Sequence, residues 1–414
     1  MARILIAWEL GEALGHLARA LHLTLRLRER GHEVVLVLKR LPEPGDLAGL
    51  PGVLCLPAPP LRQSGPPDGI APVNYADLLR CCGYADAAEL AARLTCWRGL
   101  LARTCPDVLL ADHAPTALLA ARMEGVAHLA VGNGFAVPPR VDPWPSIRPW
   151  QAVDVGRLNG AERALDDVVD AALARQGFAA RVRMRELYGA QDVLDTFPEL
   201  DHYGARPEGC YVGPIMRVTE FRSVSWQPED GHRVLAYLRT PMPGFGSLVK
   251  GLADSGAEVL CVVPGLPADA ARGLATRRMR IACVPVALPA LLREASLAVG
   301  YGSSGFATEA LLAGVPVLSR PRHVEQALFA RRIAALGAGR LLEGRLALGG
   351  VAEVVRDLLA RPDSGAAARA FAERHHDYCP DGAVDRTVAA IERCVGVVPT
   401  PASQPNLVPE SSMP

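Results

Sequence analysis

The chain has 414 residues, of which 50% are hydrophobic and 21% are charged, and its 44 basic residues balance its 44 acidic residues. This length is enough for two domains of ordinary size, and the composition is that of a globular protein rather than a disordered one. Zero net charge without a long basic run argues against a nucleic-acid partner, so none is expected.

The start of the chain and its cysteines bear on location. MARILIAWEL contains a short apolar run broken by Glu9, which predicts a buried strand and not a signal peptide. No apolar run is long and uncharged enough to span a bilayer. The ten cysteines show no CxxC spacing, which indicates reduced thiols in a cytoplasmic protein. Peripheral contact with a membrane stays open, and the sequence gives no oligomeric state.

Apolar runs alternate with helical patterns in the first part of the chain. RILIAW (3–8), EVVLVL (33–38), DVLLAD (107–112) and AHLAVGN (127–133) predict buried strands with helices between them. Such βαβ units imply parallel strands, so a doubly wound, Rossmann-like sheet is expected. The proline-rich and tryptophan-rich residues 137–150 predict a long loop.

A second alternating set follows a stretch of turn residues. The predicted fold class is therefore α/β, with two Rossmann-like domains at residues 1–212 and 232–396 and a linker at 213–231. Whether the last helix packs back on the first domain is left open, and residues 397–414 are expected to be disordered. Ligands of such sheets bind at the carboxyl ends of the strands, in the cleft expected between the domains.

One stretch, YGSSGFATEALLAGVPVLSRPRHVEQ (301–326), carries several polar residues at such strand ends. Residues 302–305 form a turn of small residues before a predicted helix, whose N-terminal N–H groups favour a phosphate. The Glu309 carboxylate can accept hydrogen bonds from ribose hydroxyls, and Glu325 with Gln326 suits the hydroxyls of a sugar. Each feature alone is equally consistent with an ordinary turn or helix start; their combination favours a nucleotide-sugar site.

A candidate base lies in the first domain. His16 opens the first predicted helix, and Asp112 ends a strand, so both are expected at the carboxyl edge of the sheet. A histidine can take the proton of an attacking hydroxyl, and a carboxylate behind it fixes the tautomer and stabilises the imidazolium. The alternative is a helix-capping or core histidine. The neighbouring His113 is expected to point away from this pair and to be structural.

Residues 301–326 resemble the donor-site signature of the family 1 glycosyltransferases, which include UDP-glucuronosyltransferase-like and bacterial antibiotic-glycosylating enzymes. The family pattern is approximately H-G-G-x-G-T-x-x-E-A-L-x-x-G-V-P-x-x-x-x-P-x-x-x-[DE]-Q. The positions that agree with it are Gly302, Gly305, Glu309, Ala310, Leu311, Gly314, Val315, Pro316, Pro321, Glu325 and Gln326. The resemblance implies the GT-B fold and a UDP- or dTDP-sugar donor. It also implies that His16 is the base and Asp112 its partner.

The chain departs from the family at several positions, one of which is Ser303, where the pattern has glycine. Tyr301 replaces the histidine that contacts the donor diphosphate, Phe306 replaces a threonine, and Arg19 replaces the usual proline three residues after the base. Ser303 and Ser304 are expected to compensate in part for the missing histidine. The resemblance further implies a phosphate contact at Arg239.

The resemblance also implies a loop at Pro285 and Val286 that binds the uracil or thymine of the donor nucleotide. The predicted function is an inverting glycosyltransferase that needs neither metal nor cofactor and that transfers a sugar to a hydroxyl of a small-molecule or lipid acceptor. Two alternatives stay open: a sugar-nucleotide epimerase on the same architecture, and a non-catalytic GT-B protein.

Overall fold

The computed structural model describes residues 1–11, 14–47, 50–62, 65–66, 69–215, 221–227, 230–240, 242–344 and 350–395. These residues form two compact units. Unit 1 comprises the described residues of 1–198, 205–215 and 380–395, and unit 2 comprises 199–204 and those of 221–379. Much of the predicted linker (216–220, 228–229) and all of the predicted tail (397–414) lie outside the described residues, so the predicted domain boundaries stay a prediction.

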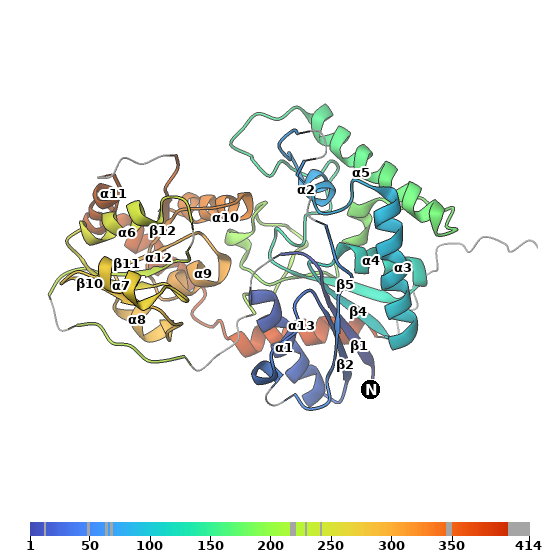
Figure 1. Ribbon diagram of the computed structural model, residues 1–414, viewed down its shortest axis with the longest axis horizontal. Helices are drawn as coiled ribbons and strands as arrows, with labels where there is room; N and C mark the ends of the chain where they lie inside the picture. Colours follow the sequence, from blue (N-terminus) through green and yellow to red (C-terminus); the bar gives the residue numbers. More distant parts are fainter. Residues whose placement is uncertain are drawn as a thin grey trace, which may run out of the picture. The chain divides into compact units, whose positions relative to one another are not determined.

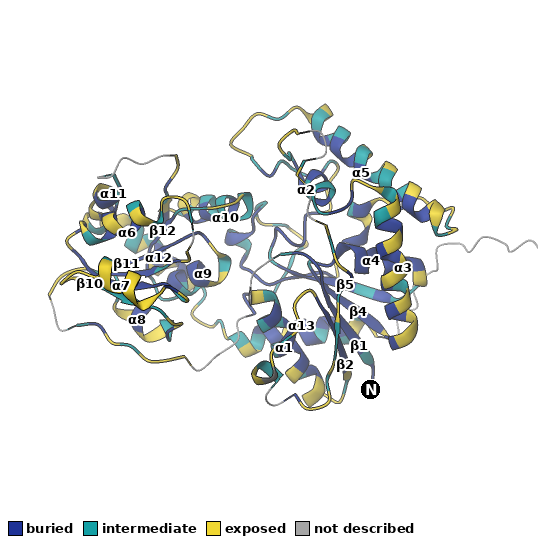
Figure 2. Ribbon diagram, viewed as in Figure 1, coloured by how far each residue is buried: buried dark blue, intermediate teal, exposed yellow. Residues whose placement is uncertain are grey.

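Unit 1 is built on a parallel sheet whose strands are ordered β3-β2-β1-β4-β5-β6-β7. Its strands are β1 (Arg3–Trp8), β2 (Glu33–Leu38), β3 (Leu54–Pro57), β4 (Val108–Asp112), β5 (Ala127–Gly132), β6 (Val193–Leu194) and β7 (Cys210–Tyr211). Its helices are α1 (Leu14–Glu29), α2 (Tyr75–Cys81), α3 (Ala87–Thr104), α4 (Pro115–Glu124), α5 (Val155–Arg175) and α13 (Pro380–Cys394). The inner strands read as unbroken apolar runs because helices cover both faces, and Figure 2 shows them buried.

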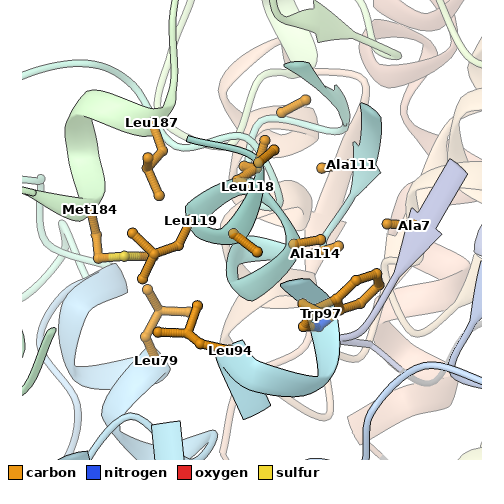
Figure 3. Packing of buried hydrophobic residues seen from close by; sticks show 14 of the residues in the cluster. Ala7, Leu79, Leu94, Trp97, Ala111, Ala114, Leu118, Leu119, Met184 and Leu187 are labelled. Atoms are coloured by element: carbon orange, nitrogen blue, oxygen red, sulfur yellow. The ribbon is translucent and has the colours of Figure 1, made fainter. Parts of the chain in front are cut away.

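Different helices cover the two faces of this sheet (Figure 1). On one face α13, from the far end of the chain, lies beside α1 and contacts β4 and β5. Arg26 of α1 bonds Asp385 of α13 at 2.8 Å, and Arg30 bonds Glu392 at 3.2 Å. On the other face the small residues Ala7 and Ala111 of the sheet belong to the core formed with the large side chains of α3 and α4 (Figure 3).

Unit 2 repeats the plan with a six-stranded parallel sheet ordered β10-β9-β8-β11-β12-β13. Its strands are β8 (Arg233–Tyr237), β9 (Glu258–Val262), β10 (Met279–Ala282), β11 (Leu297–Gly300), β12 (Val317–Ser319) and β13 (Gly339–Leu341). Its helices are α6 (Phe245–Ala253), α7 (Ala268–Leu274), α8 (Leu288–Glu294), α9 (Ser304–Leu312), α10 (Val324–Ala335), α11 (Gly350–Ala360) and α12 (Pro362–Arg374). The predicted fold class of two doubly wound parallel sheets is therefore confirmed.

The strand orders say where polar side chains gather. In each sheet the order reverses between two adjacent strands, β1 and β4 in unit 1 and β8 and β11 in unit 2. Loops leaving the carboxyl ends of such a pair diverge to opposite faces, which opens a crevice. The predicted catalytic pair, His16 and Asp112, lies at the ends of β1 and β4, and the predicted donor loop follows β11. No helix among the described residues is long and apolar enough to cross a membrane.

Candidate functional site

In unit 1 the loop between β1 and α1 brings His16 to the carboxyl edge of the sheet. Glu9 anchors this loop from the inside, where it is buried and accepts hydrogen bonds from Trp97 Nε1 at 2.7 Å and Thr116 N at 2.8 Å. Gly11 follows with φ of +85°, and a Cβ on it would lie 2.5 Å from His16 Nε2. A glycine is therefore needed here for its backbone conformation and for the space that the imidazole occupies.

His16 pairs with Asp112, as the sequence predicts. Trp8 at the end of β1 lies opposite Asp112 at the end of β4 in the parallel register, which brings the two strand ends together. His16 Nδ1 lies 2.8 Å from Asp112 Oδ1, and the carboxylate is 1% exposed. The Trp8 ring stacks on the imidazole with centroids 5.2 Å apart. When Nδ1 carries the hydrogen and donates it to Asp112, the lone pair of the neutral imidazole lies on Nε2. Nε2 is then the atom that can accept a proton.

Arg19 and Asp195 complete this cluster, and the sequence analysis assigned a role to neither. Arg19 Nη1 donates to Asp112 Oδ2 at 2.6 Å, and Nη2 donates to Asp195 Oδ2. Burial alone would raise the pKa of Asp112, but the charges of Arg19 and His16 and their hydrogen bonds together outweigh it, so that the pKa of Asp112 lies below its usual value. Two signals were present: Arg19 stands where the family has proline, and Asp195 ends a short apolar run as Asp112 does.

His113 lies on the same side of the sheet as His16, so the expectation that it points away is wrong. Its backbone has φ of +48°, and its ring centroid lies 6.1 Å from that of His16. The ring also stacks at 6.2 Å on Tyr75, which packs against buried Trp144. A row of aromatic rings, of which Tyr75 and Trp144 are buried, therefore connects the candidate base to the core of unit 1.

In unit 2 the donor loop begins with Tyr301, whose hydroxyl is used within the protein. It donates to the Arg239 carbonyl at 2.7 Å and accepts from the Arg239 amide at 3.0 Å. Tyr301 is 6% exposed and belongs to the core of unit 2. It thus ties the loop after β11 to the loop after β8. Phe306, the second departure from the family, packs on Tyr237 with ring centroids 5.6 Å apart.

The small residues after Tyr301 form the start of α9. Ser303 is its N-cap and makes no side-chain capping bond, and Ser304 and Gly305 are the first two helical residues. Gly302 has φ of +80°, and a Cβ on it would lie 2.9 Å from the Gln326 carbonyl oxygen. Glycine thus lets the loop approach the first turn of α10, which carries both Glu325 and Gln326. The structure brings these predicted donor residues together.

Glu309 lies one turn further along α9 and is the most unusual acid of unit 2. Burial raises its pKa to about 7, and no hydrogen-bond or ion-pair partner contacts its carboxylate among the described residues. A mostly buried acid without a partner is costly to ionise. Such a group is expected where a ligand supplies the missing donors.

The two residues of the predicted nucleobase-binding loop differ in exposure. Pro285 is exposed, whereas Val286 is 1% exposed and its backbone forms a bridge with Arg222. The Val286 side chain therefore faces the interior of unit 2, and only its backbone is placed to contact a ligand.

Three arginines surround the donor loop without a carboxylate in ion-pair distance in the described part of the chain: Arg239, Arg320 and Arg322. The Arg322 guanidinium lies 5.6 Å from the centroid of the Tyr301 ring. The Arg320 guanidinium reaches Gly244 at the start of α6, where a Cβ would lie 2.8 Å from its Nη2. Guanidinium groups suit diphosphate oxygens. Only Arg239 was singled out from the sequence.

Comparison with known proteins bears on the fold and on the class of enzyme. No protein-family model matches the chain. A PGL/p-HBAD biosynthesis glycosyltransferase of Mycobacterium tuberculosis is 26% identical over 299 residues, which cover 67% of this chain and 68% of the relative. The calicheamicin glycosyltransferase CalG4 superposes with a TM-score of 0.67 at 19% identity, covering 95% of this chain and 98% of CalG4.

The chain is a GT-B glycosyltransferase. The predicted family and class of enzyme are thereby confirmed. The glycosyltransferase VinC, whose structure was solved with dTDP, has the same fold, with a TM-score of 0.65 at 18% identity over 94% of this chain and 100% of VinC. No group of three or more His, Cys, Asp or Glu side chains suited to a metal ion occurs in the described parts of this glycosyltransferase.

Proposed function

We propose that the protein transfers a sugar from a UDP- or dTDP-sugar to a hydroxyl of a small-molecule or lipid acceptor, with inversion at the anomeric carbon. The observation that carries this proposal is the buried His16–Asp112 pair at the reversal point of the unit 1 sheet. In the proposed step, His16 Nε2 takes the proton of the acceptor hydroxyl as its oxygen attacks the anomeric carbon. The bond from that carbon to the diphosphate oxygen breaks in the same displacement, which inverts the centre.

Asp112 supports this step electrostatically. When Nε2 gains the proton the imidazole becomes a cation, and the Nδ1–H bond to Asp112 at 2.8 Å becomes a charge-assisted one. The carboxylate thus stabilises the charge that develops on the base and keeps the ring in its reactive tautomer. Asp112 is ionised at neutral pH because its pKa lies below its usual value.

The donor is assigned to unit 2. The N–H groups at the start of α9, together with Ser303 and Ser304, would hold the diphosphate, and Arg239 would add a positive charge. Glu309 would accept hydrogen bonds from the ribose, Glu325 and Gln326 would bind the sugar, and residues 285–286 would contact the base. The dTDP in the VinC structure supports this class of donor. The charge of the leaving diphosphate would be neutralised by these groups, so the proposal includes no metal or other cofactor.

The acceptor is assigned by analogy. The mycobacterial relative is named for PGL/p-HBAD biosynthesis and CalG4 for calicheamicin, and these names support an acceptor of low molecular mass rather than a protein. A cytoplasmic location and peripheral contact with a membrane belong to the proposal as well.

Thermal unfolding of the full chain with UDP, dTDP, GDP and ADP tests the donor. A ligand that binds only the folded protein stabilises it by about 2.7 kcal/mol at a hundredfold excess over its dissociation constant. We expect UDP or dTDP to raise the unfolding temperature, and Glu309→Ala to reduce the rise. Turnover is then tested as nucleotide release from the corresponding sugar donor with phenolic and polyketide acceptors. Binding without turnover would favour the non-catalytic alternative, and no binding at all would contradict the donor assignment.

A further inference from the structure

We propose that Arg19 and Asp195 are positioning residues for the His16–Asp112 pair, and that Arg19 neutralises Asp112 so that His16 remains able to accept a proton at lower pH than a lone His–Asp pair would allow. This inference rests on the proposed role of His16 as the base. Arg19 stands where the family pattern has proline.

The geometry is set by one helix and three strands. His16 and Arg19 are separated by three residues on α1, so their side chains lie on one face of the helix. Asp112 ends β4, and Asp195 directly follows β6; β5, which ends at Gly132, lies between them. The Asp195 amide donates to the Gly132 carbonyl at 3.0 Å, which fixes the backbone of the second aspartate. Arg19 thus spans the edge of the sheet and bonds both carboxylates.

Each carboxylate oxygen of Asp112 consequently has a separate partner. Oδ1 faces His16 at 2.8 Å and Oδ2 faces Arg19 at 2.6 Å. A carboxylate held at both oxygens cannot rotate, so the imidazole that it orients is held as well. The planar guanidinium, with parallel donors, suits this task better than an ammonium group.

The charge balance of the cluster gives Arg19 a second effect. The side chains of Arg19 and Asp195 are 11% and 6% exposed, so water screens their charges weakly. Two carboxylates and one guanidinium leave a net charge of −1 while His16 is neutral, and protonation of His16 brings the sum to zero. Removing Arg19 would leave two negative charges and favour the imidazolium, whereas neutralising Asp195 would remove one and disfavour it.

The protonation state of Asp195 is itself sensitive to its surroundings. Burial raises its pKa to about 6, with Arg19 acting in the opposite direction, and its Oδ1 has no hydrogen-bond partner among the described residues. Among the described residues, the rings packed against His16 are those of His113 at 6.1 Å and Trp8 at 5.2 Å. Lys39 Nζ bonds the carbonyl of Gly11, the residue beside the imidazole, at 3.0 Å. His113 is titratable, so its own titration has to be followed alongside.

The test is an NMR titration of the histidine side chains in the full chain, with His16→Gln and His113→Gln assigning the two signals among ten histidines. We expect the protonation midpoint of His16 to move up by about one pH unit in Arg19→Met and down by about half a unit to one unit in Asp195→Asn. Arg19→Lys should return the midpoint towards the parent value. These opposite shifts do not follow from a merely structural role.

Arg26→Met is the matched control. Arg26 also lies on α1 and faces three carboxylates: Glu29 of the same helix at 3.1 Å, and Asp381 at 3.7 Å and Asp385 at 2.8 Å on α13. Its removal should leave the His16 midpoint unchanged. Shifts in the same direction for both test variants, or no shift in either, would overturn the proposal. Should Arg19→Met fail to fold, the isosteric Asp195→Asn decides alone, because it keeps the size of the side chain.

This titration needs neither donor nor acceptor, so it separates the proposal from the proposed function. Where turnover is measurable, the acidic limb of the kcat/KM profile should move with the NMR midpoint in the same variants. Shifted midpoints with an unshifted acidic limb would show that the electrostatics are right and that His16 is not the base. Unshifted midpoints would contradict the role of Arg19 whatever the activity.

Discussion

The two candidate sites of this chain differ in how many of their polar groups have hydrogen-bond or ion-pair partners within the protein. Around His16 the charged groups bond one another: Asp112 has a partner at each oxygen, and Arg19 joins it to Asp195. Around the donor loop, Ser303 makes no side-chain capping bond, and the Glu309 carboxylate, whose pKa burial raises to about 7, has no hydrogen-bond or ion-pair partner among the described residues. The first site is organised before any substrate binds, whereas the second contains two groups whose partners a ligand would bring.

This difference indicates what each site does. A base must hold one geometry through the reaction, so fixed protein contacts around it lower the cost of reaching the transition state. A donor site must release its product, so strong internal bonds there would compete with the nucleotide. In unit 2 both kinds of residue occur side by side. The Tyr301 hydroxyl bonds the Arg239 backbone and so stabilises the fold, whereas the next residues, Gly302 to Ser304, are available to a ligand.

The largest effect is expected at the base. His16→Ala should lower turnover about 10²- to 10⁴-fold, because no other group at that position can take the acceptor proton. Nucleotide affinity should stay within about twofold, since the contacts of His16 lie in unit 1. Single-turnover kinetics and nucleotide titration measure the two quantities. An equal loss in both would contradict the separation of roles.

The converse change concerns Glu309. Glu309→Ala should weaken nucleotide binding about 10- to 100-fold, the cost of losing hydrogen bonds to a charged acceptor. Because the Glu309 carboxylate has no hydrogen-bond or ion-pair partner among the described residues, the unfolding temperature of the ligand-free protein should not fall. Calorimetric titration and thermal unfolding check the pair of expectations. A destabilised free protein with intact affinity would assign Glu309 to the fold instead.

A smaller effect should come from pH. Burial raises the pKa of Glu309 to about 7, so its carboxylate is mostly ionised at pH 8 and mostly protonated at pH 6. If ribose hydroxyls donate to the ionised form, nucleotide affinity should fall about tenfold between these values, the direction set by loss of the acceptor on protonation. Glu309→Gln is the control and should bind weakly with little such slope. A slope of the same size in the variant would point to another titrating group.

The smallest effect is expected at Tyr301. Tyr301→Phe removes two hydrogen bonds to the Arg239 backbone and should destabilise unit 2 by about 1 kcal/mol, with a few-fold loss of nucleotide affinity as the loop loosens. Tyr237→Phe is the matched control, because its hydroxyl has no hydrogen bond among the described residues. Thermal unfolding of the two variants compares them. A large loss of affinity without a loss of stability would instead make the Tyr301 hydroxyl a ligand contact.

Much of this arrangement could be predicted from the sequence because it depends on strand ends. Apolar runs fix where parallel strands stop, so the proximity of His16 to Asp112 follows from the adjacency of β1 and β4. The small residues between β11 and α9 were recognisable in the same way, and Glu309 follows them at fixed helical spacing.

Other features depend on tertiary packing that a local pattern does not reveal. Asp195 follows a strand of only two residues, 83 positions beyond Asp112, so nothing local connects the two. The Tyr301 hydroxyl could be read as a ligand contact until its bond to Arg239 was seen. His113 was misplaced because its left-handed backbone reverses the direction expected from strand alternation.

The position of α13 has a consequence for synthesis of the chain. This helix is made after the whole of unit 2, yet its acids bond Arg26 and Arg30 of α1 and it covers β4 and β5. The part of that face over β4 and β5 therefore stays uncovered on the ribosome until α13 emerges. A nascent chain would have a folded second unit before its first is finished, and premature termination would expose the sheet that carries the base.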